Sequence, residues 1–229
     1  MRVNGKRPPP TGVFIDPQTD RITVHGNAVK PVTRHRYILL NKPLGVITTA
    51  KDQVSRTTVL DVVGDEGKGG HRLFPVGRLD ADTSGLLLLT DDGDLAFRLT
   101  HPGYKVSKEY VALVAGNPST ADIDSLRNGV ELDDGLTAPA EVDVLRITPG
   151  SRDSGVAEIR IVIREGRHRQ VRRMLHFTGH KVQSLKRVGF GPLKLGRLKV
   201  GGWRVLGEAE ITALQRAVEN KKDQLKRPK

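Results

Sequence analysis

The stretch GRLDADTSGLLLLT, residues 77–90, joins a loop that carries two aspartates to an uninterrupted apolar run. The four leucines at residues 86–89 are bounded by turn residues, which predicts a strand buried on both faces. Asp80 and Asp82 therefore fall in a loop that leads directly into the core. Local sequence alone favours a turn in which Asp80 accepts backbone hydrogen bonds, but a carboxylate at the mouth of a rigid strand is also a candidate for chemistry.

The turn TDDGD at residues 90–94 predicts the start of a helix over residues 95–100, with Asp94 as its cap. Asp91, Asp92 and Asp94 lack the ligand spacing of a calcium loop. We therefore interpret these three residues as turn and cap.

The chain of 229 residues can form one large domain or two small ones. It contains no cysteine, which excludes disulfides and thiolate catalysis and is compatible with a reducing cytoplasm. No apolar run approaches the length of a membrane span and no secretory pattern is found, so we expect a cytoplasmic protein without a membrane anchor. A monomer is the default expectation.

Charge is the strongest global signal, with 38 Lys and Arg against 26 Asp and Glu and a net charge of +12. Residues 164–204 hold twelve Lys and Arg against one acid, Glu165, an excess of +11. This concentration predicts a surface that attracts a polyanion and releases its counterions. With 4% aromatic residues, a single-strand reader built on many stacked rings is not expected.

Apolar periodicity and turn signals predict an α+β fold with a mixed, mostly antiparallel sheet and flanking helices. Helices are expected over 57–63, 95–100, 118–128 (capped by Ser119), 170–177 and 208–219. A hairpin turn is expected at 132–135, and a glycine-rich turn without phosphate-loop spacing at 64–70. Strands are expected at 21–26, 37–40, 46–49, 86–89, 108–114, 157–164, 182–187 and 203–206.

Four segments carry a family resemblance: NKPLG (41–45), GRLDADTSGLLLLTDDGDLAFRLTHP (77–102), KEY (108–110) and REGRHRQVRRM (164–174). In this order they resemble the pseudouridine synthases of the RsuA/RluB type, which isomerise selected uridines in ribosomal RNA. The resemblance covers residues 37–206. The GRLD segment joined to the EGRHRQVRRM segment is highly specific, and either one alone is less so.

The resemblance implies the pseudouridine synthase fold with a central catalytic cleft. The family's catalytic aspartate falls on Asp80, its active-site tyrosine on Tyr110, and the basic residue that pairs with the aspartate on Arg172. An apolar residue of the family's pocket matches Leu185, whereas Asp82 matches a variable position and is interpreted as a loop residue. The other candidate substrate-binding residues are Lys42, Arg78, Arg167, Arg169, Gln170 and Arg173.

The implied reaction breaks the bond from ribose C1′ to N1, turns the uracil and rejoins it through C5. It involves no redox change or net hydrolysis, so the resemblance implies no cofactor and no metal. Asp80 acts as a nucleophile or assists at the electron-poor sugar, held charged by Arg172, while Tyr110 stacks on the uracil and takes part in proton transfer. Whether Asp80 attacks the sugar, attacks the base or promotes a glycal route stays open.

The implied partner is ribosomal RNA or a pre-ribosomal particle, whose target base must leave its stack. The basic segment 164–204 is the candidate RNA surface. The patterns RQVRR at 169–173 and GGW at 201–203 are more similar to the large-subunit enzymes.

Three domains are expected: residues 1–33, 34–220 and 221–229. Residues 1–33 resemble the second half of an S4-like RNA-binding domain plus a linker, which implies an amino-terminal truncation with reduced affinity and target choice. Residues 34–220 form the catalytic domain and 221–229 a basic tail.

Two other function classes and a metal site fit the sequence less well. A non-catalytic RNA-binding or ribosome-assembly protein on the same fold would be free to lose Asp80, Tyr110 and Arg172, so their joint presence argues against it. A glycoside hydrolase that uses Asp80 and Asp82 is disfavoured because sugar sites favour aromatic platforms. A metal site at His168, His176 and His180 is disfavoured by the surrounding arginines.

Overall fold

The computed structural model describes residues 1–16, 19–29, 34–50, 54–68, 72–148 and 155–219. The chain divides into two compact units, residues 1–35 and 36–229. This division lies two residues from the expected end of the first domain. The likeness of the first unit to an S4 domain stays a prediction, and the expected tail at 221–229 lies outside the described residues.

The first unit is a small antiparallel sheet in the order β1-β2-β3. Its strands are β1 (Arg2–Val3), β2 (Ile22–Val24) and β3 (Asn27–Val29). His25 and Gly26 join the last two strands with φ of 50° and 84°, the left-handed conformation that a tight hairpin requires. The predicted strand at 21–26 is thus confirmed in its first part and turns back at its end.

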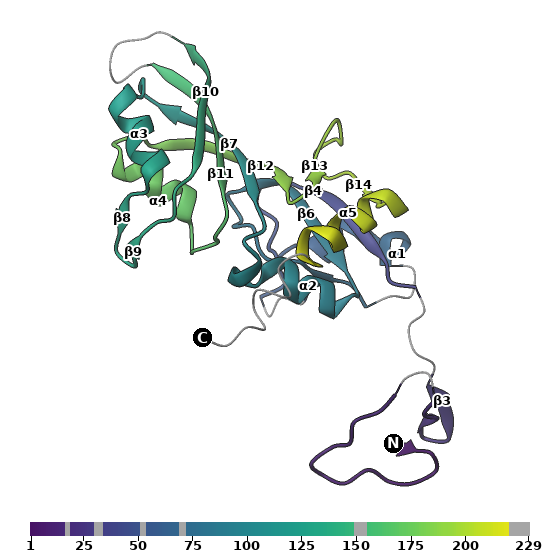
Figure 1. Ribbon diagram of the computed structural model, residues 1–229. Coiled ribbons are helices and arrows are strands. Elements are labelled where there is room, and N and C mark those ends of the chain that lie inside the picture. The colour runs from purple at the N-terminus through teal and green to yellow at the C-terminus, as the bar shows by residue number, and fades with distance from the viewer. Residues whose placement is uncertain (17–18, 30–33, 51–53, 69–71, 149–154, 220–229) are drawn as a thin grey trace, which may run out of the picture. The chain divides into compact units, whose positions relative to one another are not determined.

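The second unit is built on one large sheet, which can be followed in Figure 1 from β10 to β14. Strands β12 and β6 are parallel, and the other pairs described in this sheet are antiparallel, so the predicted mixed sheet is confirmed. The order is β10 (Glu141–Thr148), β11 (Val156–Ile163), β7 (Lys108–Ala115), β12 (Val182–Phe190), β6 (Ser84–Thr90), β4 (Tyr37–Lys42) and β14 (Trp203–Val205), with β13 (Leu193–Lys194) on β12 and β5 (Phe74–Pro75) on β6.

Two apolar clusters cover the two faces of the sheet. Leu87 and Leu89 of β6 belong to one cluster, Leu86 and Leu88 to the other, and all four are 0% exposed. The strand is therefore buried on both faces, as predicted. The first cluster packs against α1 (Val59–Lys68), α3 (Thr120–Asn128) and α4 (Gln170–Phe177), and the second against α2 (Gly93–Thr100) and α5 (Glu208–Glu219).

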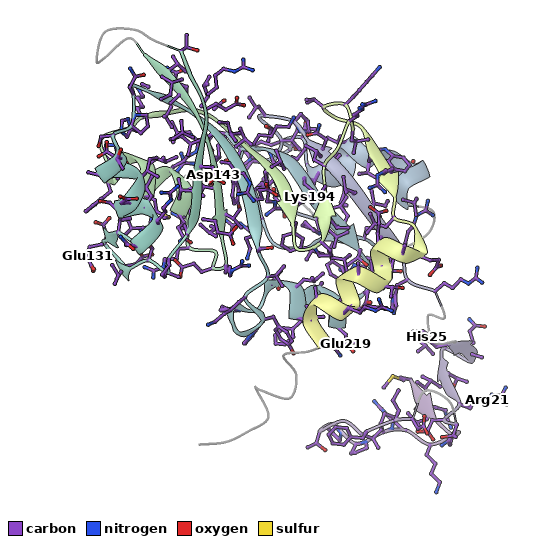
Figure 2. All side chains as sticks on the ribbon, turned by 45° about the horizontal axis from the view of Figure 1, so that its top comes forward. Arg21, His25, Glu131, Asp143, Lys194 and Glu219 are labelled. Carbon is purple, nitrogen blue, oxygen red and sulfur yellow. The ribbon has the colours of Figure 1, made fainter. Side chains whose placement is uncertain are left out.

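Several predicted boundaries are confirmed by the structure. Helices α4 and α5 begin and end at the predicted residues. Ser119 caps α3, and its hydroxyl and the carboxylate of Asp122 exchange hydrogen bonds with the backbone in a capping box. The predicted hairpin is formed by β8 (Glu131–Leu132) and β9 (Gly135–Leu136); Glu131 is labelled in Figure 2.

Three predictions for local structure are wrong. No strand forms at 46–49, because Ile47 makes only an isolated bridge to Thr58. Helix α1 continues to Lys68 past a non-helical Gly64, where a turn was expected. The cap of α2 is Asp92, whose Oδ1 accepts from the Leu95 N–H at 2.9 Å, so Asp94 lies in the first turn instead.

Candidate active site

The loop that carries Asp80 is fixed by hydrogen bonds to residues before it in the chain. Thr83 N–H donates to Asp80 O at 3.0 Å and closes a turn within the loop. Thr48 Oγ1 donates to Leu79 O at 2.7 Å, and Gly45 N–H donates to Ala81 O at 2.8 Å. The NKPLG segment therefore contributes to the site by anchoring the backbone of the aspartate loop.

Gly85 brings the aspartate loop against β12. Its φ is +106°, and a Cβ built on it would lie 2.2 Å from Arg187 O. Only glycine therefore fits where β6 pairs in parallel with β12 at Arg187. This close approach places the loop beside the side chains of β12.

The loop opens onto a cavity of about 540 Å³ within the second unit. Its wall comes from four parts of the chain: the aspartate loop, the segment from α2 into β7, the segment from β11 into α4, and β12. The predicted site residues on this wall are Arg78, Asp80, Tyr110, Arg167, Arg169, Gln170, Arg172 and Leu185. The tertiary structure thus brings together most of the predicted site residues.

Asp80 is paired with Arg169, which immediately precedes α4. Arg169 Nη1 lies 3.6 Å from Asp80 Oδ2, and the side chain of Asp80 is 28% exposed. The same guanidinium donates to both carboxylate oxygens of Asp82, at 3.0 and 2.7 Å. These hydrogen bonds hold the pKa of Asp82 below its ordinary value.

Arg172 binds Asp82, and the predicted pairing of Arg172 with Asp80 is not found. Its Nη2 donates to Asp82 O at 2.6 Å, and its Nε lies 3.3 Å from Asp82 Oδ2. The turn closed by Thr83 directs Asp82 toward the first turn of α4, so Asp82 lies nearest to both arginines. Asp82 is therefore more than the loop residue that we expected.

Tyr110 and Leu185 line the cavity from neighbouring strands. Tyr110 pairs with Arg187, and Leu185 pairs with Ala112, across the antiparallel β7–β12 ladder. Tyr110 is 9% exposed and Leu185 is 5% exposed, so the floor between them is largely apolar. A flat aromatic ring beside a branched apolar side chain suits the stacking of a planar base.

Two of the predicted substrate-binding residues do not line the cavity. Lys42 is fully buried and donates from Nζ to Pro43 O at 2.9 Å. Burial lowers the pKa of Lys42 to about 8, although Asp80 and Asp82 act in the opposite direction. Arg173 lies outside the cavity, where it binds both carboxylate oxygens of Asp134.

Arg167 lies on the wall but is held by the protein. Its Nη1 donates to Gly135 O at 2.6 Å and its Nη2 to Leu136 O at 2.5 Å. Gln170 is likewise engaged, because its side chain binds the Arg167 N–H and Glu165. These residues shape the wall and fasten the β8–β9 hairpin to it.

Several polar residues of the cavity wall were not predicted as site residues, among them Thr83, Lys108 and Arg187. Lys108 stands two residues before Tyr110 on one strand, and strand alternation places both side chains on one face. That signal was available in the sequence. Arg187 was marked only as one of the cations of segment 164–204, because its place on the cavity wall depends on the pairing of β12 with β6.

The described residues contain no group of three or more His, Asp or Glu side chains that could hold a metal ion. Among the described helices, none has the length and apolar character needed to cross a bilayer.

Comparison with known proteins agrees with this geometry. The sequence model of the RNA pseudouridylate synthase family matches residues 36–177. An uncharacterised RNA pseudouridine synthase of Aquifex aeolicus is 40% identical over 95% of this chain and 84% of its own length. The ribosomal large subunit pseudouridine synthase B of Bacillus subtilis is 40% identical over 97% of this chain and 88% of its own length.

A solved structure described as a pseudouridylate synthase superposes with a TM-score of 0.70 at 31% identity, covering 93% of this chain and 87% of that one. Sequence relatives and a solved structure thus agree over nearly the whole length. The chain belongs to the RNA pseudouridylate synthase family.

Proposed function

We propose that this protein converts uridine to pseudouridine in ribosomal RNA of the large subunit, with Asp80 as the catalytic carboxylate. The single observation that carries the proposal is that Asp80, Tyr110 and Leu185 share the wall of one cavity. The large-subunit substrate is supported by the Bacillus subtilis relative, whose name states that activity. We also propose that the protein acts as a cytoplasmic monomer.

The chemistry follows from the positions of the groups. The flipped uracil stacks on Tyr110 against Leu185, which leaves ribose C1′ to face the aspartate loop. Asp80 stabilises the positive charge at C1′ as the bond to N1 breaks, by bonding to the sugar or by its field. The uracil then turns, C5 bonds to C1′ and loses its proton, and N1 gains one, so atoms and electrons balance.

Arg169 is the cation paired with this carboxylate. Its guanidinium lies 3.6 Å from Asp80 Oδ2, close enough for the two opposite charges to attract each other. Arg169 therefore lies beside Asp80 where the resemblance implied Arg172.

The test is pseudouridine mapping on unmodified ribosomal RNA incubated with the purified protein or with its Asp80→Asn variant. We expect one new pseudouridine in large-subunit RNA with the native protein. The variant should retain RNA affinity within several-fold but lose at least about 10³ in rate, as expected for removal of a central charged group.

Turnover by Asp80→Asn would remove Asp80 from the mechanism. Absence of product on naked RNA and on partly assembled subunits would favour a non-catalytic RNA-binding protein on this fold.

A further inference from the structure

Lys108 and Arg187, two cations on the cavity wall, have no carboxylate partner. Lys108 lies on β7 and Arg187 on β12, and both line the cavity that holds Asp80. In the described part of the chain, no carboxylate oxygen lies within 4.0 Å of either side chain. Unpaired cations away from water are costly, so their occurrence here requires a reason.

Arg187 is held rigidly and keeps one donor unused. The residue is 2% exposed, its Nε donates to Leu86 O at 2.7 Å, and its guanidinium lies 5.2 Å from the Phe190 ring centroid. Its Nη2 is buried without a hydrogen-bond partner. Buried donors are almost always paired in folded proteins, so this nitrogen, in a residue that lines the cavity, points to a missing acceptor.

Lys108 lies close enough to Arg187 for the two positive charges to repel each other. Burial lowers the pKa of Lys108 to about 8, and repulsion from Arg187 adds to the effect, while Glu165 acts in the opposite direction. Within the described part of the chain, its Nζ donates to Val106 O alone, at 3.1 Å. The ammonium therefore keeps further donors for a ligand in the cavity.

The nearby acids are occupied elsewhere. Glu109 points to the other face of β7, where it binds Arg160 at 2.6 Å and also binds Lys194, which Figure 2 labels. Glu165 accepts from the Gln170 side chain and from the Ala138 N–H. Glu165 attracts Lys108 only at longer range, and among the described residues no carboxylate lies within 4.0 Å of Lys108 or Arg187.

We propose that Lys108 and Arg187 form a subsite for a phosphate group of the RNA backbone next to the target uridine. The proposal rests on the proposed function and extends it to the anchoring of the flipped nucleotide. A phosphodiester fits better than a uracil carbonyl, because a neutral oxygen would satisfy Nη2 but leave two adjacent charges uncompensated.

The position suits this role. Arg187 pairs with Tyr110 across the β7–β12 ladder, so the cations stand beside the ring on which the base stacks. A phosphate held there would position the ribose over the aspartate loop, which pairs with β12 at Arg187 and Gly85. Binding energy at the phosphate would then orient the bond that breaks.

The test measures binding of uridine 3′,5′-bisphosphate and of uridine to the full chain by titration calorimetry. We expect the bisphosphate to bind at least about tenfold more tightly than uridine, a difference of about 1.4 kcal/mol. Lys108→Gln should remove most of that difference. Lys105→Gln is the matched control, because Lys105 is an exposed cation three residues away that does not line the cavity.

Arg187→Lys keeps the positive charge but replaces the forked guanidinium by an ammonium. It should weaken the binding of the bisphosphate and leave the binding of uridine unchanged. Thermal unfolding would show that the variants remain folded. Two results would refute the proposed subsite. One is equal affinity of the native protein for the bisphosphate and for uridine, and the other is the same preference for the bisphosphate in the native protein and in Lys108→Gln.

Pseudouridine mapping with the native protein separates the two proposals. Product together with an unchanged bisphosphate preference in Lys108→Gln would refute the subsite alone. A bisphosphate preference that depends on Lys108, without product on any RNA, would support the subsite and refute the proposed reaction.

Discussion

At the scale of single residues, the two carboxylates of the aspartate loop have different surroundings. Asp80 meets one guanidinium at 3.6 Å, whereas Asp82 accepts two hydrogen bonds from Arg169 and lies 3.3 Å from Arg172 Nε. Asp82 thereby fixes the arginine that faces Asp80. We interpret Asp82 as a positioning residue that acts through Arg169.

Asp82→Asn should therefore lower kcat by about tenfold to hundredfold, because Arg169 loses its charged anchor and a small misplacement near the reacting atoms is costly. The apparent affinity for RNA should stay the same or increase, since an anion that competes with phosphate for the arginines is removed. Single-turnover and binding measurements on the mapped RNA would separate the two effects.

Glu141→Gln is the control for Asp82→Asn. Glu141 also binds an arginine of the basic segment, Arg164 at 2.7 Å, but does not line the cavity. A loss of affinity in Asp82→Asn with kcat unchanged would contradict the positioning role.

At the scale of elements, the β8–β9 hairpin is tied to the start of α4 by arginines. Arg173 donates to both carboxylate oxygens of Asp134 at 3.1 and 2.9 Å, while Arg167 binds the Asp134 carboxylate and three backbone carbonyls of the hairpin. Hydrogen bonding by Arg173 lowers the pKa of Asp134 to about 2. The arginines predicted to bind RNA are therefore partly structural.

Asp134→Asn should loosen the hairpin without unfolding the domain. Backbone hydrogen exchange is expected to rise several-fold at Val130 and Thr137, whose N–H groups bond across the base of the hairpin. Exchange at Leu87 and Leu88 in the core should not change. Unchanged exchange at Val130 and Thr137 would show that the arginine contacts do not hold the hairpin.

At the scale of the whole molecule, acids from other parts of the chain pair with the cations of residues 164–204. The net positive charge that this segment presents to RNA is therefore lower than its sequence count of +11. At least seven of its twelve cations have a carboxylate from outside the segment within 4.0 Å. The tertiary structure therefore neutralises part of the predicted RNA surface. Cations without such partners carry more weight for RNA.

Arg78 is one such cation: it is exposed on the cavity wall, and no ion pair holds it within the described residues. Arg78→Gln should weaken RNA binding uniformly across sequences and lower the slope of log affinity against log salt by about 1. The measurement is a salt titration of RNA binding.

Arg160→Gln is the control, because Arg160 is bound to Glu109 and to Asp143, which is labelled in Figure 2. If Arg78→Gln had the same salt slope as the native protein, the phosphate contacts would lie elsewhere.

The sequence by itself determined the elements whose signal is local. The leucine run of β6, the apolar face of α4 and the Ser119 cap of α3 are specified by neighbouring residues, so periodicity and capping patterns predict them. The boundary errors at α1 and α2 arose where several turn residues compete, as Asp92 and Asp94 do for one cap. The resemblance also placed Asp80, Tyr110 and Leu185, which the structure brings to one cavity.

Only the tertiary structure decided the partners of the charged groups. Arg169 and Asp82 lie 87 positions apart in the chain, and Arg172 and Asp82 lie 90 apart. Charge interactions depend on distance and on access to water, which sequence spacing does not specify. For that reason Lys42 lies buried beneath the site and Asp82 holds the arginines. Lys108 and Arg187 line the cavity, and no described carboxylate lies within 4.0 Å of either.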